Sequence, residues 1–254
     1  MTTWDPNQYL KFAGHRLRPA LDLLARIPDA PYKTVWDLGC GPGNVTKLLL
    51  DRWPSAVVRG LDNSPAMLDK ARTIAGIEWI EGDIVRWTAD EPADLIFSNA
   101  ALHWVDDHAT VFPRLMQQLA RGGVLAVQMP RNFEAPSHTL LYETAREGPW
   151  RERVETLLRP SPVQRPEVYY DLLAAHATHV DLWEVEYLHV LQGENAVLEW
   201  TKGTAVRPFL DAMPAEMHAA FLAAYAARLR QAYPRRVDGM TLFPFRRLFL
   251  VAIR

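Results

Sequence analysis

A glycine-rich turn constrains the fold of this chain more than any other sequence feature. The segment VWDLGCGPGN, Val35 to Asn44, runs from an apolar strand through an acidic residue into a turn that contains Gly39, Gly41 and Gly43. Glycine at alternate positions permits positive φ angles and lets a ligand approach the backbone where a Cβ would collide. The following VTKLLLDRW has the apolar spacing of a helix. The segment therefore predicts a strand, a turn and a ligand-facing helix N-terminus, as in a Rossmann-type nucleotide site.

The spacing of these glycines bears on the kind of ligand. Dinucleotide sites have the pattern G-x-G-x-x-G, whereas here the third glycine follows the second after a single residue, Pro42. The spacing therefore disfavours a nicotinamide-dependent oxidoreductase, which is the alternative enzyme class for a turn of this kind.

Acidic and polar residues recur where further strands are expected to end. The apolar run Ala56–Leu61 ends in Asp62, and a carboxylate there can accept hydrogen bonds from both hydroxyls of a ribose. Asp83 follows a third short apolar stretch, and a fourth, ADLIFSNAALHW, leads into Asn99. Ligands bind outside the carboxyl ends of parallel strands, so we expect these side chains to share one crevice.

Strands and helices alternate through the first half of the chain. We expect strands near 33–38, 56–61, 77–80, 93–98 and 123–128, and helices near 44–53, 65–75 and 107–120. This alternation is typical of a parallel sheet with helices on both faces.

The flanking regions have different patterns. Residues 6–27 are predicted to be helical, with a break or a new start at Pro19. Short helical pieces are expected from Pro130 to about His176, followed by a strand at Trp183–Tyr187 and a last strand in LFLVAI. Between these two strands lies a helix whose apolar stripe is predicted to pack in the core. The stripe contains Met217, Phe221, Leu222, Tyr225 and Leu229.

The GxGxG turn after an acidic strand end, followed by Asp62, resembles motif I of the class I S-adenosylmethionine-dependent methyltransferases. The resemblance implies a Rossmann-like α/β fold, with a seven-stranded, mostly parallel sheet and a helical substrate lid. It also implies S-adenosyl-L-methionine as the cofactor, with Asp83 and Ile84 at the adenine. The residues expected at the cofactor are Tyr9, Arg18, Asp37, Gly39, Cys40, Gly41, Gly43, Asn44, Asp62, Asn63, Met67, Asp83, Ile84 and Asn99.

This resemblance suggests one methyltransferase domain. Its core is expected at approximately 30–130, 180–192 and 244–254, and its helical insertions at approximately 1–27, 131–179 and 194–240.

A narrower resemblance covers essentially the whole chain. Trp4 with NQYLKF, Arg16, RPA at 18–20 and DLL, then NAALHWV, EWTKGTAVRPFL and LFPFRRLFLVAIR, are similar to the bacterial trans-aconitate 2-methyltransferase family. The resemblance implies methyl-ester formation on one carboxylate of trans-aconitate, a small tricarboxylate. The residues expected at this substrate are His103, Trp104, Arg131, Trp200, Lys202, Thr204 and Arg207. Another small carboxylic acid, a hydroxyl or an amine is the alternative acceptor.

A carboxylate acceptor needs no general base, because its ordinary pKa of about 4 leaves it ionised near neutral pH. Positioning of the two reactants then supplies most of the rate, and we assign no catalytic side chain. His103 is the alternative, as a base for a hydroxyl or amine acceptor. For the charged residues of the WTKGT segment, solvated surface charge is the alternative to substrate contact.

Composition excludes several other classes of protein. The 254 residues are 49% hydrophobic, which suits a globular core, and they include one cysteine, so no internal disulfide or zinc–cysteine cluster is expected. We predict a cytoplasmic protein without membrane span or obligate protein partner. The net charge of −2 argues against nucleic acid, although residues 200–254 hold nine basic and three acidic residues. An anionic partner of this basic segment is therefore expected, and a solvated helix end is the alternative. A regulator that binds the cofactor without turnover is another alternative.

Overall fold

The computed structural model describes residues 13–158 and 160–254, and these form two compact units. Of the described residues, unit 1 contains 13–15, 131–158, 160–161 and 186–246, and unit 2 contains 16–130, 162–185 and 247–254. The sequence suggested one domain with helical insertions. In the structure, residues 162–179, which were expected in an insertion, belong to the same unit as the parallel strands. The division into one domain with insertions stays a prediction.

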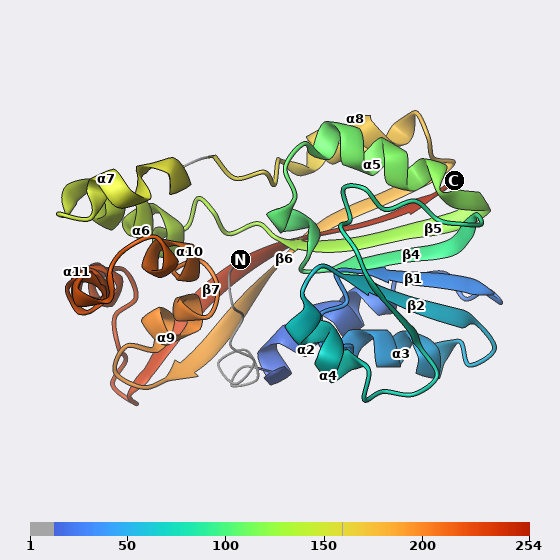
Figure 1. The fold of residues 1–254 in the computed structure, drawn as a ribbon. Coiled ribbons are helices and arrows are strands. Elements are labelled where there is room, and N and C mark those ends of the chain that lie inside the picture. Colours follow the sequence, from blue (N-terminus) through green and yellow to red (C-terminus); the bar gives the residue numbers. More distant parts are fainter. Residues whose placement is uncertain (1–12, 159) are drawn as a thin grey trace. The chain divides into compact units, whose positions relative to one another are not determined.

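Seven strands form one sheet in the order β3-β2-β1-β4-β5-β7-β6. Their bounds are Thr34–Leu38 (β1), Val57–Asp62 (β2), Glu78–Glu81 (β3), Ala93–Asn99 (β4), Leu119–Pro130 (β5), His179–Gln192 (β6) and Met240–Ile253 (β7). The first five strands pair in parallel, whereas β7 is antiparallel to β5. The expected seven-stranded, mostly parallel sheet is therefore confirmed (Figure 1).

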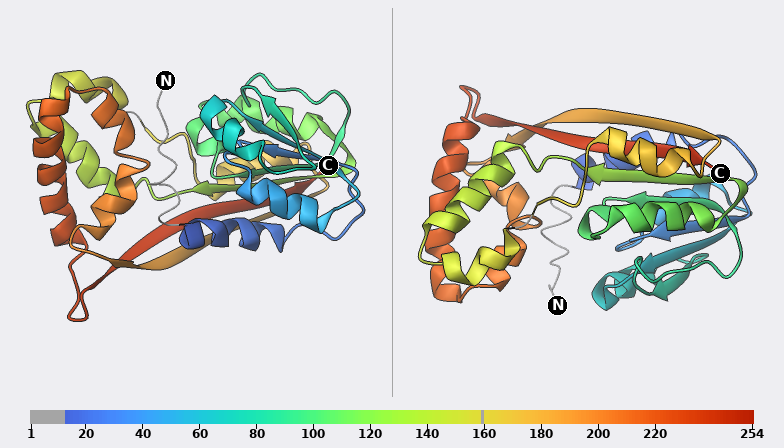
Figure 2. Two further views of the ribbon diagram at one scale, coloured as in Figure 1. Left: turned by 60° about the horizontal axis from the view of Figure 1, so that its bottom comes forward. Right: turned by 90° about the horizontal axis from the view of Figure 1, so that it is seen from above.

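Helices lie on both faces of the sheet in unit 2. In the views of Figures 1 and 2, α5 and α8 lie on one face, while α2, α3 and α4 lie on the other. Their bounds are Ala13–Leu24 (α2), Asn44–Arg52 (α3), Pro65–Ala71 (α4), His108–Gln117 (α5) and Pro166–Ala174 (α8), with a 3-10 helix η1 at Leu102–Trp104. This arrangement buries every residue of β1, as expected for a parallel strand that is covered on both faces.

Pro19 does not interrupt the helix that contains it, so the expected break within 13–24 is wrong. Proline lacks one backbone donor and its ring crowds the preceding turn. Ala20 and Leu23, which follow it, are completely buried. Their packing offsets the cost of the proline.

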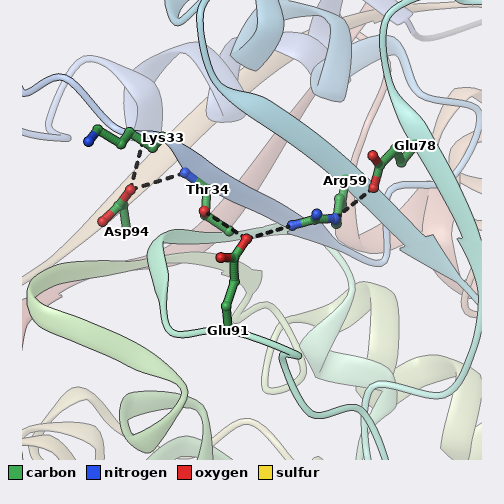
Figure 3. A network of polar contacts seen from close by, with 6 residues as sticks. All are labelled: Lys33, Thr34, Arg59, Glu78, Glu91 and Asp94. Atoms are coloured by element: carbon green, nitrogen blue, oxygen red, sulfur yellow. Dashed lines mark hydrogen bonds and ion pairs between the residues drawn. The ribbon is translucent and has the colours of Figure 1, made fainter.

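A polar network joins the strands near their amino ends (Figure 3). Arg59 of β2 lies 2.7 Å from Glu78 of β3 and 3.6 Å from Glu91. The hydroxyl of Thr34 donates to Glu91 over 3.4 Å. Asp94 accepts the backbone N–H groups of Thr34 and the preceding residue at 3.0 and 2.7 Å. These contacts tie β1, β2, β3 and β4 together.

Unit 1 contains helices and the remaining parts of β6 and β7. The helices are α6 (Pro136–Glu147), α7 (Arg151–Val154), η2 (Glu155–Leu157), α9 (Ala196–Lys202), α10 (Arg207–Asp211) and α11 (Ala215–Ala232). Phe221, Tyr225 and Leu229 of α11 lie in its hydrophobic core, and Met217 and Leu222 pack against that core. The predicted apolar stripe is therefore confirmed. Among the described helices, none has both the length and the apolarity to cross a membrane.

Candidate cofactor and acceptor site

The parallel strands of unit 2 bring the predicted polar residues to one edge of the sheet. Asp37 of β1 is paired in register with Gly60 of β2, and Asp62 is paired with the last residue of β3. Asn99, the last residue of β4, is paired with Gln128 of β5. Parallel pairing places the carboxyl ends of these strands together, as the sequence predicted.

All three glycines of the turn have left-handed backbone angles, with φ of 78° at Gly39, 55° at Gly41 and 82° at Gly43. The N–H groups of Gly39 and Cys40 donate to the carbonyl of Leu61 at 2.7 and 3.0 Å. The turn is thereby fastened to the end of β2. The predicted need for positive φ at alternate positions is confirmed.

Two of these glycines also differ in the space around them. A Cβ placed on Gly39 would lie 2.1 Å from the Cβ of Ala101 and 3.5 Å from the Cδ1 of Ile84. A Cβ on Gly41 would meet no described atom within 4 Å. The backbone at Gly39 is therefore packed against protein, whereas the backbone at Gly41 faces open space that a ligand can occupy.

The carboxylate of Asp62 is held by backbone donors. Its Oδ2 accepts the N–H of Gly41 at 2.8 Å, and its Oδ1 accepts the N–H of Ser64 at 2.9 Å. Burial raises the pKa of Asp62, and the backbone N–H groups of Ser64, Gly41 and Asn63 oppose this rise. A carboxylate has about four acceptor positions, so each oxygen keeps capacity for a hydroxyl donor such as a ribose.

Asp37 is buried below the turn. Its Oδ2 accepts the hydroxyl of Thr46, at 2.6 Å, from the first part of α3. Burial raises the pKa of Asp37 to about 7, the bond from Thr46 opposes this, and the charge of Asp62 adds to it. Sequence reasoning did not single out Thr46, although it lies nine residues after the acidic residue in the same strand–turn–helix unit.

Cys40 is 7% exposed. Its burial, together with the negative charges of Asp37 and Asp62, raises the pKa of the thiol far above its ordinary value. The thiol is therefore protonated and unreactive at neutral pH. A contact of Cys40 with the cofactor stays a prediction.

The segment after β3 contains the residues expected at the adenine. Asp83 is exposed and its Oδ1 accepts the N–H of Val85 at 2.9 Å, while Ile84 is buried. Arg114 of α5 donates to the carbonyls of Ile84, at 2.7 Å, and Trp87. Sequence reasoning missed Arg114, which positions this segment from a helix thirty residues away.

The residues present fit S-adenosylmethionine, the cofactor that the resemblance implies. The Oδ1 of Asn99 is buried and has no hydrogen-bond partner among the described residues. An unpaired buried acceptor is costly unless a ligand satisfies it. Together with the open space at Gly41 and the remaining acceptor positions of Asp62, this orphan atom indicates a polar ligand at the sheet edge.

The remaining predicted cofactor residues differ in position. Asn44 begins α3 and is exposed, Asn63 is exposed, and Met67 is buried in α4. Arg18 has a side chain that is 71% exposed and lies 4.0 Å from Asp22. Tyr9 lies outside the described residues. Contacts of these residues with the cofactor stay predictions.

The segment after β4 carries His103 and Trp104 in η1. Their ring centroids lie 4.7 Å apart, and Trp104 is 48% exposed. Leu102 directly precedes His103, and its carbonyl lies 3.0 Å from the Nε2 of His108. The Nδ1 of His108 lies 2.6 Å from the Tyr169 hydroxyl. Because a carbonyl only accepts, His108 carries its proton on Nε2 and accepts from Tyr169. No local sequence pattern indicates this buried contact between α5 and α8.

The residues predicted at the acceptor in the basic segment belong to unit 1. Lys202 lies 2.9 Å from Glu199, and Arg207 lies 3.0 Å from Asp211, so each cation has a carboxylate on its own helix. The Thr204 hydroxyl donates to the carbonyl of Thr201 at 3.4 Å. Contacts of Lys202, Thr204 and Arg207 with an acceptor stay predictions.

Trp200 and Arg131 also lie in unit 1. Trp200 is buried, and its ring stacks on His189 with a centroid distance of 4.5 Å. Its evident role is packing, and a substrate contact stays a prediction. Arg131 follows β5 directly and donates its backbone N–H to the carbonyl of Arg246 at 2.9 Å.

We predict that Asp37 makes the stability of the unliganded protein depend on pH. Between pH 3.8 and about 7, the folded state keeps a proton that the unfolded chain has released. The free energy of unfolding should therefore fall as the pH rises through this window, by at most about 1.4 kcal/mol per pH unit. Asp37→Asn should lose this slope when urea unfolding is measured across the window. Equal slopes in both proteins would contradict the assignment.

Comparison with known proteins agrees with this geometry. The model of a family described as "Methyltransferase domain" matches residues 35–123, the part that contains β1 to β4 and the glycine turn. The solved structure of YcgJ from Bacillus subtilis superimposes with a TM-score of 0.59 at 14% identity, covering 93% of this chain and 98% of that chain. This similarity shows the fold.

Two curated relatives are much closer in sequence. The trans-aconitate 2-methyltransferase of Azoarcus sp. is 50% identical over 255 residues, covering 100% of both chains. The trans-aconitate 2-methyltransferase of Streptomyces coelicolor is 52% identical, covering 98% of this chain and 86% of the relative. The chain therefore belongs to the trans-aconitate 2-methyltransferase family, within the class I methyltransferase fold.

Proposed function

We propose that this protein transfers the methyl group of S-adenosylmethionine to one carboxylate of trans-aconitate, giving the monomethyl ester and S-adenosylhomocysteine. The observation that carries the proposal is the fastened glycine turn, with Asp62 beside open space at Gly41, in a chain that matches relatives of this name along its whole length. Labelled methyl transfer to a panel of small di- and tricarboxylic acids, with product identification, tests it. A hydroxyl or amine product would replace it with the alternative acceptor class.

Different residues of the chain bind different parts of the cofactor. Asp62 accepts from the ribose hydroxyls, the backbone at Gly41 lines the ligand, and the Asp83–Ile84 segment borders the adenine. The positive end of the α3 dipole lies at Asn44, and the N-cap residue Gly43 supplies no side-chain hydrogen bond there. Arg114 keeps the adenine segment in place through two backbone carbonyls.

S-adenosylmethionine supplies, when bound, an electrophilic methyl group on a sulfonium centre. The protein orients the acceptor carboxylate for in-line attack and excludes water, which supplies most of the rate. The acceptor is already ionised at neutral pH, so no side chain has to remove a proton. His103 and Trp104 form part of the wall beside the reacting groups, and His103 acts there as a hydrogen-bonding residue.

The carboxylates that are not methylated require cations. We propose that Arg131, Lys202, Thr204 and Arg207 take part in binding them, on the grounds of the basic segment and its family likeness. We also propose a cytoplasmic location. The chain has a single cysteine and so cannot form an internal disulfide, which agrees with a reducing compartment.

Asp62→Ala should weaken cofactor binding by about 1–3 kcal/mol, because ribose hydroxyls lose their acceptor and the Gly41 amide loses its partner. Calorimetry with S-adenosylmethionine measures this loss. Asp69→Ala, which removes an exposed carboxylate paired with Arg72 in the same region, is the control and should bind normally. A folded Asp62→Ala protein of unchanged affinity would rule out the ribose assignment.

Replacing His103 by Gln should retain substantial methyl transfer, because Gln still offers hydrogen bonds and no base is needed. The pH profile of kcat/KM should fall in acid as the acceptor carboxylate becomes protonated. Single-turnover rates with both ligands bound provide the measurement. Loss of nearly all of that rate in His103→Gln would instead identify His103 as a base.

Arg207→Ala should raise the KM for trans-aconitate by on the order of 10- to 100-fold, which corresponds to a charge-assisted contact of about 1.5–3 kcal/mol. The KM for S-adenosylmethionine should change much less. Arg230→Ala is a matched control, because Arg230 belongs to the same basic segment and contacts Asn195 at 2.8 Å. If Arg207→Ala and Lys202→Ala both leave tricarboxylate kinetics unchanged, these charges belong to the surface.

A further inference from the structure

A row of polar side chains crosses one face of the sheet in unit 2. Paired residues on neighbouring strands point to the same face, as do residues two apart on one strand. By this rule Asp62 and Asp37 share a face, because Asp37 pairs with the residue two before Asp62. The β4 residue that pairs with Asp37 lies two positions before Asn99, so Asn99 points to the same face. Gln128 of β5 pairs with Asn99 and therefore also points to this face. Arg247 pairs with the residue two beyond Gln128 and completes the row.

The far end of this row is buried and cationic. Gln128 is 0% exposed and Arg247 is 5% exposed. The Nη1 of Arg247 donates to the Oε1 of Gln128 at 3.4 Å. A buried guanidinium is stabilised by hydrogen-bond acceptors, and the amide oxygen of Gln128 is one of those of Arg247. A guanidinium has five N–H donors, so it can bind an anion in addition to its other contacts.

Two atoms of the row lack partners among the described residues. They are the Oδ1 of Asn99, an acceptor, and the Nε2 of Gln128, a donor, and both are buried. A buried donor beside a buried cation favours an anionic acceptor as ligand. Asn99 is itself partly exposed, so the row reaches solvent at that residue.

We propose that Gln128 and Arg247 bind one of the carboxylates of the acceptor that is not methylated. The inference rests on the proposed function, because the acceptor must lie beside the cofactor residues. The charge along the row changes from two carboxylates, at Asp62 and Asp37, through two amides to a guanidinium. The anionic acceptor belongs at the cationic end, and the cofactor at the acidic end.

The dimensions agree with this assignment. Neighbouring strands are about 4.8 Å apart, so β4 and β7 are separated by roughly 10 Å with β5 between them. A six-carbon tricarboxylate is long enough to reach from the end of β4 towards Arg247. The sequence prediction placed the acceptor cations in the WTKGT segment, and Arg247 adds a cation in the unit that contains the cofactor residues.

The test compares two neighbouring arginines. Arg247→Met keeps much of the buried volume and removes the charge, and Gln128→Glu keeps the shape and adds a negative charge that repels a carboxylate. Arg246→Met is the control, because Arg246 is exposed and lies 3.7 Å from Glu186. The readouts are KM values and the rise of the melting temperature on adding trans-aconitate without cofactor, which reports binding independently of turnover.

Arg247→Met and Gln128→Glu should each raise the KM and the dissociation constant for trans-aconitate about 10-fold or more, with S-adenosylmethionine affinity within about twofold of the wild type. Arg246→Met should match the wild type in both ligands. Should Arg247→Met misfold, Gln128→Glu still decides the question. Normal acceptor affinity in the folded variants overturns the proposal.

Failure of the proposed function would give a different experimental result from failure of the Gln128–Arg247 subsite. A wild-type protein that neither binds nor methylates trans-aconitate excludes that substrate. The same melting measurements with mono-, di- and tricarboxylic acids then test the subsite directly. An acid that stabilises the wild type but not Arg247→Met supports the carboxylate site. If no acid stabilises the wild type more than Arg247→Met, the subsite does not exist.

Discussion

The hydrogen bond from the N–H of Gly41 to the carboxylate of Asp62 joins the turn after β1 to the end of β2. It forms only because Gly39 and Gly41 adopt left-handed backbone angles, which direct the amide across the strand ends. The same turn places Ile84 and Ala101 against Gly39 and starts α3 above the buried Asp37. The segments after four strands thus depend on one backbone conformation, which explains why three glycines within five residues carry so much of the fold.

Much of the sheet, and the gathering of polar residues at the carboxyl ends of its strands, was predictable from sequence because the signals are local. Apolar runs of strand length, each followed by a helix, specify a parallel sheet. Parallel pairing then brings Asp37, Asp62 and Asn99 to one edge without further information. The break at Pro19 was wrong because local propensity does not register the packing of Ala20 and Leu23, which outweighs one missing hydrogen bond.

Residues that act across the fold were not predictable in this way. Arg114 and His108 lie on α5, and each contacts a backbone carbonyl in the segment that follows a different strand. Arg247 appears in sequence as one of two adjacent arginines in an apolar strand. Only the pairing of β5 with β7 shows that it faces Gln128, while Arg246 beside it is exposed. A period of two along a strand separates a buried cation from a surface cation, and sequence composition counts both alike.

The position of Cys40 has a practical consequence. It is the single cysteine of the chain, and it lies inside the turn that holds Asp62. A thiol-specific alkylating reagent can react with it only while the turn is open and the sulfur is exposed. The alkylation rate of the Cys40 sulfur in the native protein therefore measures how often this turn opens, and no label has to be introduced. Ligands that bind over the turn should lower the alkylation rate, and ligands that bind elsewhere should leave it unchanged.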